Sequence, residues 1–218
     1  TRAAAEAFTD EAVARMQQIY AEPIKAELIR DRIAEIRAAG VTVAGALSPQ
    51  RTVEFYQTVI KAGVDIFVIR GTNVSAEHVS KQAEPLNLKQ FIYELDVPVI
   101  VGGASTYTSA LHLMRTGAAG VLVGFGGGRA STTRKVVGIH APMATAVADV
   151  AGARRDYMDE SGGRYVHVIA DGGLGGGEDN HLGVGGGVFE QLNLVPRTGD
   201  DGAIANDHCA HGHFVGLV

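Results

Sequence analysis

Short apolar segments alternate with helix-like segments along most of this chain, and glycine separates the two at three places. Ala39-Gly40-Val41, Ala62-Gly63-Val64 and Thr116-Gly117-Ala118 each lead into such an apolar segment. Glycine commonly follows the last turn of a helix, and short continuous apolar runs are typical of strands buried on both faces. The pattern therefore predicts a parallel β-sheet covered by helices.

The expected elements follow from this pattern. Residues 1–39 are rich in helix-forming residues, with a start expected at Thr9-Asp10-Glu11 and an interruption at Pro23. Helical spacing after Pro23 predicts one apolar face, made of Ile24, Leu28, Ile29, Ile33 and Ile36. Further helices are expected over 49–62, 88–95, 105–115 and 142–155, and strands over 41–47, 65–69, 97–101, 120–123 and 165–170.

Two architectures are built from such units, an open doubly wound sheet and a closed barrel. Glycine or polar residues follow several strands, at 69–72, 101–103, 123–126 and 170–173. A doubly wound sheet concentrates its site at one switch point, whereas a barrel shares its site among all the loops at the strand carboxyl ends. About five units are present, and a closed barrel needs eight. The expected fold is therefore α/β, a partial (β/α)8 TIM barrel over residues 1–173.

Glycine is unusually frequent, at 29 of 218 residues, and part of the excess lies in Gly173 to Gly187. That stretch has neither helical nor strand periodicity. Residues 174–218 are therefore expected to form a glycine-rich, irregular and poorly ordered tail.

Charge and cysteine content exclude several classes of protein. The formal net charge of −5 argues against a nucleic-acid partner, which a basic surface would bind. No apolar run has the length of a membrane-spanning helix, so no membrane partner is expected. Cys209 is the only cysteine, which excludes an internal disulfide and is typical of a cytoplasmic protein.

The most informative segment is the glycine-rich run 124–134, which follows an expected strand. Backbone amides of such a loop can hold an anion, and its carbonyls can hold a monovalent cation. A flexible glycine loop with no ligand is the alternative interpretation of the same composition.

This run resembles the catalytic loop of the IMP dehydrogenase/GMP reductase family. The segments 97–103, 113–118 and 168–173 also match that family in residue type and spacing. The similarity covers roughly residues 35 to 173. The chain is most similar to the divergent IMP dehydrogenase-related branch that lacks CBS domains, and the resemblance implies a truncated member.

The resemblance implies a purine-nucleotide oxidoreductase that moves hydride between a nicotinamide cofactor and purine C2 of IMP or GMP. Ser131 stands at the position of the nucleophilic cysteine, and Thr133 contacts the base region. By the same resemblance, the residues that bind the substrate are Gly128, Arg129, Asp171, Gly172 and Gly173.

The resemblance further implies NAD or NADP as the cofactor and a potassium ion held by backbone carbonyls. The cofactor residues are Arg70, Gly71, Thr72, Gly102 and Gly103, and the potassium residues are Gly126, Gly128 and Ser131. The resemblance also implies a homotetramer, as is usual in that family. Ser131, Arg70 and Ala104 depart from the family pattern, because dehydrogenases of the family carry a cysteine, an aspartate and usually an asparagine there. A non-catalytic protein that binds purine nucleotides or other subunits is therefore the alternative hypothesis.

Overall fold

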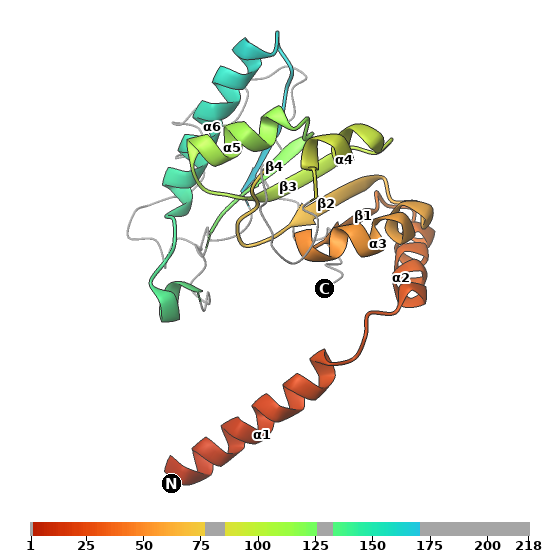
Figure 1. The fold of residues 1–218 in the computed structure, drawn as a ribbon, viewed down its shortest axis with the longest axis vertical. Coiled ribbons are helices and arrows are strands. Elements are labelled where there is room, and N and C mark those ends of the chain that lie inside the picture. The colour runs from red at the N-terminus through yellow and green to blue at the C-terminus, as the bar shows by residue number, and fades with distance from the viewer. Residues whose placement is uncertain (1, 77–85, 126–132, 171–218) are drawn as a thin grey trace.

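The computed structural model describes residues 2–76, 86–125 and 133–170, in which helices and strands alternate (Figure 1). The strands of the described residues are β1 (Ala44–Leu47), β2 (Ile66–Arg70), β3 (Val99–Ala104), β4 (Gly120–Val123) and β5 (His167–Ala170). The helices are α1 (Arg2–Tyr20), α2 (Ala26–Ala38), α3 (Pro49–Lys61), α4 (Leu88–Glu94), α5 (Tyr107–Arg115), α6 (Met143–Glu160) and the π-helix η1 (Thr133–Val137).

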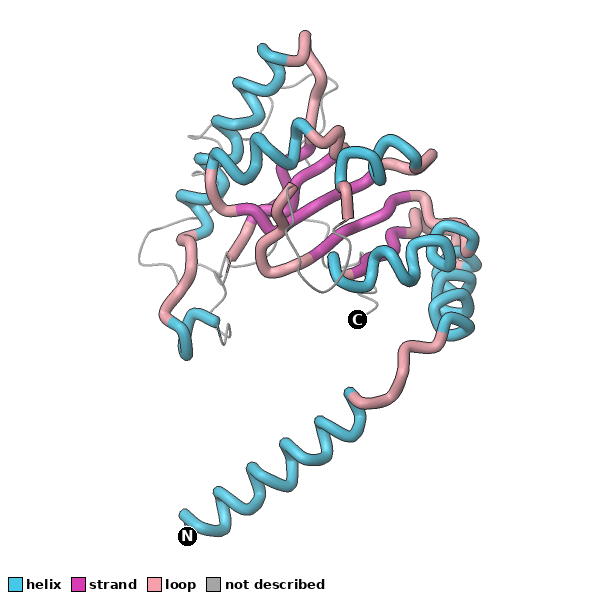
Figure 2. Tube along the Cα trace, viewed as in Figure 1, coloured by secondary structure: helices cyan, strands magenta, loops and turns pink. Residues whose placement is uncertain are grey.

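The strands form one parallel sheet in the order β1-β2-β3-β4-β5, the same as their order in the chain (Figure 2). Crossovers between parallel strands are right-handed, so strands added in one direction place every connecting helix on the same face. A doubly wound sheet instead reverses direction at its switch point and carries helices on both faces. The observed order is that of part of a TIM barrel, as expected.

The main core lies between the sheet and these helices. It contains side chains from every strand, among them the fully buried Phe67, Val101 and Val121. A second, smaller cluster contains Ala46, Val68 and Leu122. Because side chains alternate along a strand, the two clusters lie on opposite faces of the sheet.

The expected glycine stops are confirmed by backbone conformation. Gly40, Gly63 and Gly117 follow α2, α3 and α5 with φ angles of 72°, 88° and 97°. Positive φ is the conformation that ends a helix and favours glycine over other residues. The three glycine-containing segments that repeat in the sequence are therefore three similar helix C-termini.

One expectation about the first forty residues was wrong, and a second was wrong at one residue, Leu28. Helix α1 runs through Thr9-Asp10-Glu11 and begins at Arg2, so this acidic segment is not a helix start. In α2, Ile29 and Ile33 are 2% exposed, whereas Leu28 is 52% exposed. Ile24 and Ile36 are partly buried and pack against the same core, so the expected apolar face is confirmed except at Leu28.

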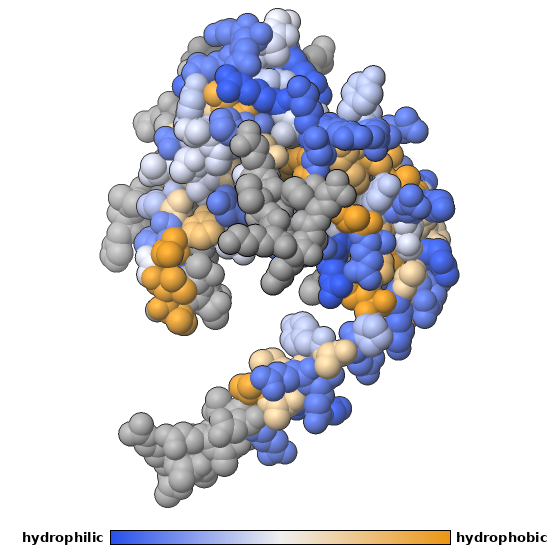
Figure 3. Space-filling model, viewed as in Figure 1, coloured by the Kyte–Doolittle hydropathy of each residue, from blue (hydrophilic) through white to orange (hydrophobic). Residues whose placement is uncertain are grey.

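Helix α1 extends away from the sheet, and its last turns carry exposed apolar side chains (Figures 1 and 3). They are Val13, Met16, Ile19 and Tyr20. Among the described helices, none combines the length and the hydropathy that a bilayer span requires. The expected division between a domain at 1–173 and a tail at 174–218 lies largely outside the described residues.

Candidate active site

The segment after β2 is hydrogen-bonded to the carboxyl end of β3. The Gly71 amide donates to the Gly102 carbonyl at 2.7 Å, and the Gly103 amide donates back to the Gly71 carbonyl at 2.8 Å. The Val74 amide donates to the Gly103 carbonyl at 3.0 Å. Residues 70–72 and 102–103, for which the family resemblance implies a cofactor role, are thus joined by main-chain hydrogen bonds.

Gly103 is where three strand ends meet. A Cβ atom placed there would lie 2.4 Å from the carbonyl oxygen of Gly124 and 3.0 Å from that of Thr72. Both neighbours are backbone atoms, which cannot rotate away as a flexible side chain does. Glycine is therefore required for the ends of β2, β3 and β4 to approach one another this closely.

The loop after β4 is closed at its base. The Gly124 amide donates to the Ala104 carbonyl at 3.0 Å, and the Ala141 amide donates to the Phe125 carbonyl at 2.9 Å. The second bond joins the residues on either side of the predicted catalytic loop. Both ends of that loop are therefore anchored at the carboxyl edge of the sheet.

Thr133 is the first residue of η1, within this loop. The π-helix is followed by Gly138, which has a φ angle of 73° and whose amide donates to the Arg134 carbonyl at 3.2 Å. After Ala141 the chain enters α6. The backbone of Thr133 thus belongs to the loop that the sequence singled out.

Arg70 ends β2 and is exposed. It is the register partner of Gly102 on β3. Thr72, two residues later, is also exposed. A basic side chain therefore stands at the edge of the sheet, among residues assigned to the cofactor.

Several predicted site residues lie outside the described residues, and their roles stay predictions. Strand β5 ends at Ala170, directly before the first of the predicted ribose and phosphate residues. The predicted residues outside the described ranges are Gly126, Gly128, Arg129, Ser131, Asp171, Gly172 and Gly173.

Sequence analysis did not single out Ser105, which follows β3. Its Oγ atom is buried and has no hydrogen-bond partner among the residues that the structure describes. The sequence placed residue 105 at the start of a helix, where a hydroxyl is ordinary. No local pattern marks it, because the burial of one atom depends on distant parts of the chain.

Two side-chain contacts, a hydrogen bond and an ion pair, join helix α6 to α5. Tyr107 Oη donates to Asp156 Oδ2 at 2.5 Å, and this bond raises the pKa of Tyr107. Arg115 donates to both carboxylate oxygens of Glu160, with Nε–Oε1 at 2.9 Å and Nη2–Oε2 at 2.6 Å. The Arg115 bond lowers the pKa of Glu160. These contacts hold the helix that follows the predicted catalytic loop.

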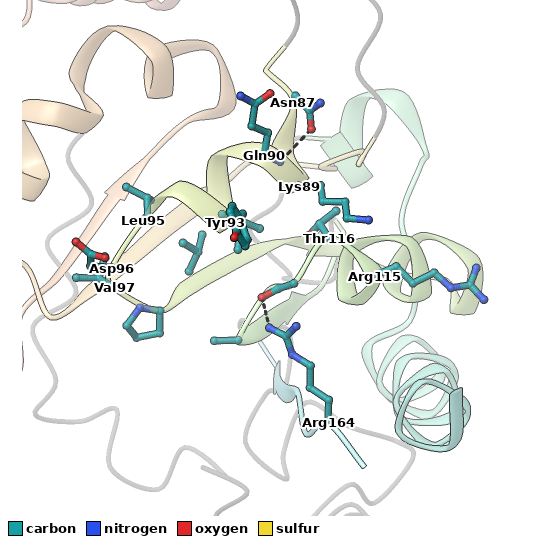
Figure 4. Close-up of a pocket in the computed structure, with 15 residues that line it drawn as sticks. Asn87, Lys89, Gln90, Tyr93, Leu95, Asp96, Val97, Arg115, Thr116 and Arg164 are labelled. Carbon is teal, nitrogen blue, oxygen red and sulfur yellow. Dashed lines mark hydrogen bonds between the residues drawn. The ribbon is translucent and has the colours of Figure 1, made fainter. Parts of the chain in front are cut away.

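A groove of about 790 Å³ lies at the other edge of the sheet (Figure 4). It is lined by residues before β3 and β4, including Pro98 and Gly117, and by Tyr93 of α4. These positions are at the amino ends of the strands. Sites of TIM barrels lie at the carboxyl ends, so the groove is separate from the candidate active site.

Two of the charged side chains that line this groove, Arg115 and Arg164, contact other groups of the protein. Arg164 Nη2 donates to the Gly117 carbonyl at 2.7 Å (Figure 4), and Arg115 is paired with Glu160. Their guanidinium groups support the turns around the groove. The contacts therefore indicate a structural role.

The described ranges contain no group of three or more His, Cys, Asp or Glu side chains placed to hold a metal ion. The potassium prediction concerns backbone carbonyls at 126–131, outside these ranges. It therefore stays a prediction.

Comparisons with known proteins agree with this geometry. The family model described as "IMP dehydrogenase / GMP reductase domain" matches residues 11–187. An uncharacterized oxidoreductase of Mycobacterium tuberculosis is 53% identical over 173 residues, covering 79% of this chain and 46% of that protein. Inosine-5'-monophosphate dehydrogenase of Haemophilus influenzae is 32% identical over 150 residues, covering 69% of this chain and 28% of that enzyme.

A solved structure is also similar. The crystal structure of an IMP dehydrogenase/GMP reductase-like protein from Corynebacterium glutamicum aligns with a TM-score of 0.66 and 54% identity. The match covers 72% of this chain and 40% of that one. This chain therefore spans less than half the length of these relatives. With a family match that extends over most of its residues, the chain belongs to the IMP dehydrogenase/GMP reductase domain family.

Proposed function

We propose that this chain carries the nucleotide-binding edge of a purine-nucleotide oxidoreductase. The reaction moves a hydride between C2 of the purine in IMP or GMP and a nicotinamide cofactor, NAD or NADP. One observation carries the proposal: the ends of three neighbouring strands meet at Gly103, where a Cβ atom would lie within 3.0 Å of carbonyl oxygens from both flanking segments. They do so at the edge where barrel enzymes bind their substrates. Membership of a family whose relatives are named oxidoreductases supports it.

In this proposal the purine nucleotide is bound by the loop after β4 and the segment after β5. Asp171 accepts hydrogen bonds from the ribose hydroxyls. The amides of Gly128, Gly172 and Gly173 donate to the phosphate, and Arg129 pairs with it as a planar cation. Thr133, at the start of η1, contacts the base region.

The proposed cofactor residues lie around the joined ends of β2 and β3. The main chain of Gly71 and Gly103 is already hydrogen-bonded at 2.8 Å, so the backbone is held in place before a ligand arrives. The buried Ser105 hydroxyl, which lacks a partner among the described residues, offers a donor beside them. This edge is therefore compatible with a polar cofactor. The bound nicotinamide supplies the hydride acceptor or donor.

In this proposal the weak nucleophile Ser131 limits the rate of the covalent step. A covalent step at purine C2 needs an activated nucleophile, and a serine hydroxyl is a weak nucleophile without an adjacent base. A cysteine at the same position is already a few per cent thiolate near neutral pH. We therefore infer nucleotide binding with a slow or absent covalent step.

The second candidate function is non-catalytic purine-nucleotide binding or subunit interaction. Three departures from the family pattern favour it, and one of them is Ala104, where dehydrogenases of the family usually carry asparagine. Ser131 replaces the nucleophilic cysteine, and the exposed Arg70 stands where dehydrogenases of the family place an aspartate. A homotetramer, implied by the family, would be detected by light scattering of the purified protein.

A thermal melt with and without IMP or GMP tests the binding proposal. Ligand at about 100 times its dissociation constant adds roughly 2.7 kcal/mol to the free energy of unfolding. For a chain of this size we expect the midpoint to rise by about 5–11 °C. A cooperative melt that neither nucleotide moves would contradict the proposal.

A further inference from the structure

The Ser105 side chain has a buried oxygen with an unused hydrogen-bonding capacity. Its Oγ atom finds no partner among the residues that the structure describes. A buried hydroxyl without a hydrogen bond is destabilising, and most such groups in folded proteins are paired. An unpaired one therefore points to a partner beyond the described residues, such as a bound ligand.

The hydroxyl is not needed for the helix cap beside it. In α5 the cap residue is Thr106, whose Oγ1 accepts from the Ser109 amide at 3.3 Å. Ser109 Oγ in turn donates to the Thr106 carbonyl at 3.0 Å. The first turn of the helix is thus satisfied by these two residues, and Ser105 takes no part.

Ser105 directly follows the last residue of β3. Ala104, at the end of β3, is 1% exposed and packs in the core between sheet and helices. Thr106 has extended dihedral angles, with φ −130° and ψ 153°. Ser105 thus stands between the buried end of β3 and the residue that caps α5.

The neighbouring backbone contacts place Ser105 between two parts of the candidate active site. Two residues earlier, Gly103 is bonded to Gly71 in the segment after β2. One residue earlier, the Ala104 carbonyl accepts from Gly124, where the loop after β4 begins. Ser105 thus lies at the carboxyl edge, between the proposed cofactor residues and the proposed catalytic loop.

We propose that the Ser105 hydroxyl hydrogen-bonds the nicotinamide cofactor in the complex with purine nucleotide. The inference rests on the proposed function and adds a contact residue to it. A cofactor fits better than the purine nucleotide because Ser105 follows Gly102 and Gly103, which with residues 70–72 make up the proposed cofactor site. The chemistry required of the ligand is an oxygen acceptor, which carboxamide, ribose and phosphate groups all provide.

The Ser105→Ala variant separates this role from a structural one. Removing an unpaired buried hydroxyl relieves a destabilising group, so the melting midpoint of the free protein is expected to rise by roughly 2–4 °C. Losing a hydrogen bond to the cofactor is expected to weaken NAD or NADP binding by about tenfold. Binding of IMP is expected to stay unchanged.

Ser109→Ala is the matched control in the same segment. It removes the cap contacts of Ser109 Oγ with Thr106, so we expect a lower melting midpoint. Its affinity for the cofactor should equal that of the parent protein. We therefore expect Ser105→Ala to raise the melting midpoint and Ser109→Ala to lower it.

The experiment measures IMP binding by titration calorimetry, then NAD and NADP binding at saturating IMP, for the parent protein and both variants. A higher midpoint and weakened cofactor binding in Ser105→Ala support the inference. Unchanged cofactor affinity in that variant overturns it and leaves the proposed function standing. A parent protein that binds IMP but neither cofactor also overturns it. A parent protein that binds no nucleotide overturns the proposed function and this inference together.

Discussion

The backbone amide of Ala141 donates a 2.9 Å hydrogen bond to the carbonyl oxygen of Phe125. This bond joins the two ends of the loop that contains Ser131 and Thr133. The packing of Met143, at the start of α6, against the core also holds the far end of this loop. The Phe125–Ala141 bond gives a long loop a defined base at the carboxyl edge.

Replacing Ala141 by proline removes this donor. We expect the Ala141→Pro variant to be cleaved faster by trypsin after Arg134, because the loop base opens without the bond. The melting midpoint is expected to fall by only a few degrees, about what one lost hydrogen bond produces. Limited proteolysis followed by mass spectrometry measures the cleavage rate. Ala141→Gly keeps the amide and is the control; equal cleavage of both variants would show that the bond does not close the loop.

A methyl group at Gly103 is predicted to separate the strand ends. Its Cβ would lie 2.4 Å from the Gly124 carbonyl oxygen, so the Gly103→Ala backbone must shift. We expect about 2–3 kcal/mol of destabilisation, the usual cost of overpacking, and a midpoint lower by roughly 4–12 °C. A melt followed by circular dichroism measures it.

Gly152→Ala is a control variant for which we expect the opposite change in stability. It lies inside α6, and a Cβ there would come no closer than 3.7 Å to the side chains of Arg155 and Tyr107. Because alanine is a better helix former than glycine, Gly152→Ala should stabilise the protein by about 0.5–1 kcal/mol. If Gly103→Ala melted like Gly152→Ala, the proposed convergence of strand ends would be wrong.

Ionisation of Asp65 is expected to account for part of the pH dependence of stability. The Val43 amide donates to Oδ2 at 2.8 Å, and Arg37 Nη2 donates to Oδ1 at 3.0 Å. These contacts, the Val43 bond above all, lower the pKa of Asp65 from its ordinary 3.8. A carboxylate whose pKa is lower in the folded state stabilises the protein above the unfolded pKa. That contribution disappears as the pH falls through the lower, folded value.

The melting midpoint should therefore fall as the pH drops below about 4, in part because of Asp65. Asp65→Asn is expected to melt lower than the parent near neutral pH and to show a shallower decline in this acid range. Melts at a series of pH values measure the difference. Asp31→Asn, on the exposed side of α2, is the control. Parallel curves for the parent and Asp65→Asn would contradict the assignment.

In our proposal the serine at position 131 slows the covalent step. Replacing it by cysteine is therefore expected to raise activity. With IMP and NAD, Ser131→Cys should form reduced cofactor at least about a hundredfold faster than the parent, because the nucleophile dominates the rate of a covalent mechanism. The absorbance of the reduced cofactor measures it, and Ser131→Ala is the inactive control. If the cysteine variant binds IMP and stays inactive, the non-catalytic function is the better account.

The candidate site was only partly predictable. Residues 70–72 and 102–103 were grouped from the sequence, and the structure joins them through the bonds between Gly71 and Gly103. This was predictable because the carboxyl ends of neighbouring parallel strands share one edge of a sheet. The unpaired hydroxyl of Ser105 was not. A serine before a helix is ordinary in sequence, and its burial depends on parts of the chain far from it.

The succession of helices and strands, the glycine stops, the partial barrel and the family could all be predicted from the sequence. These follow from backbone preferences, side-chain spacing and motifs, which act over a few residues. The exposure of Leu28 became known from the structure. It alone revealed the Phe125–Ala141 contact and the requirement for glycine at position 103. The physical reason is that these features depend on atoms brought together from distant segments, and no local pattern encodes their distances.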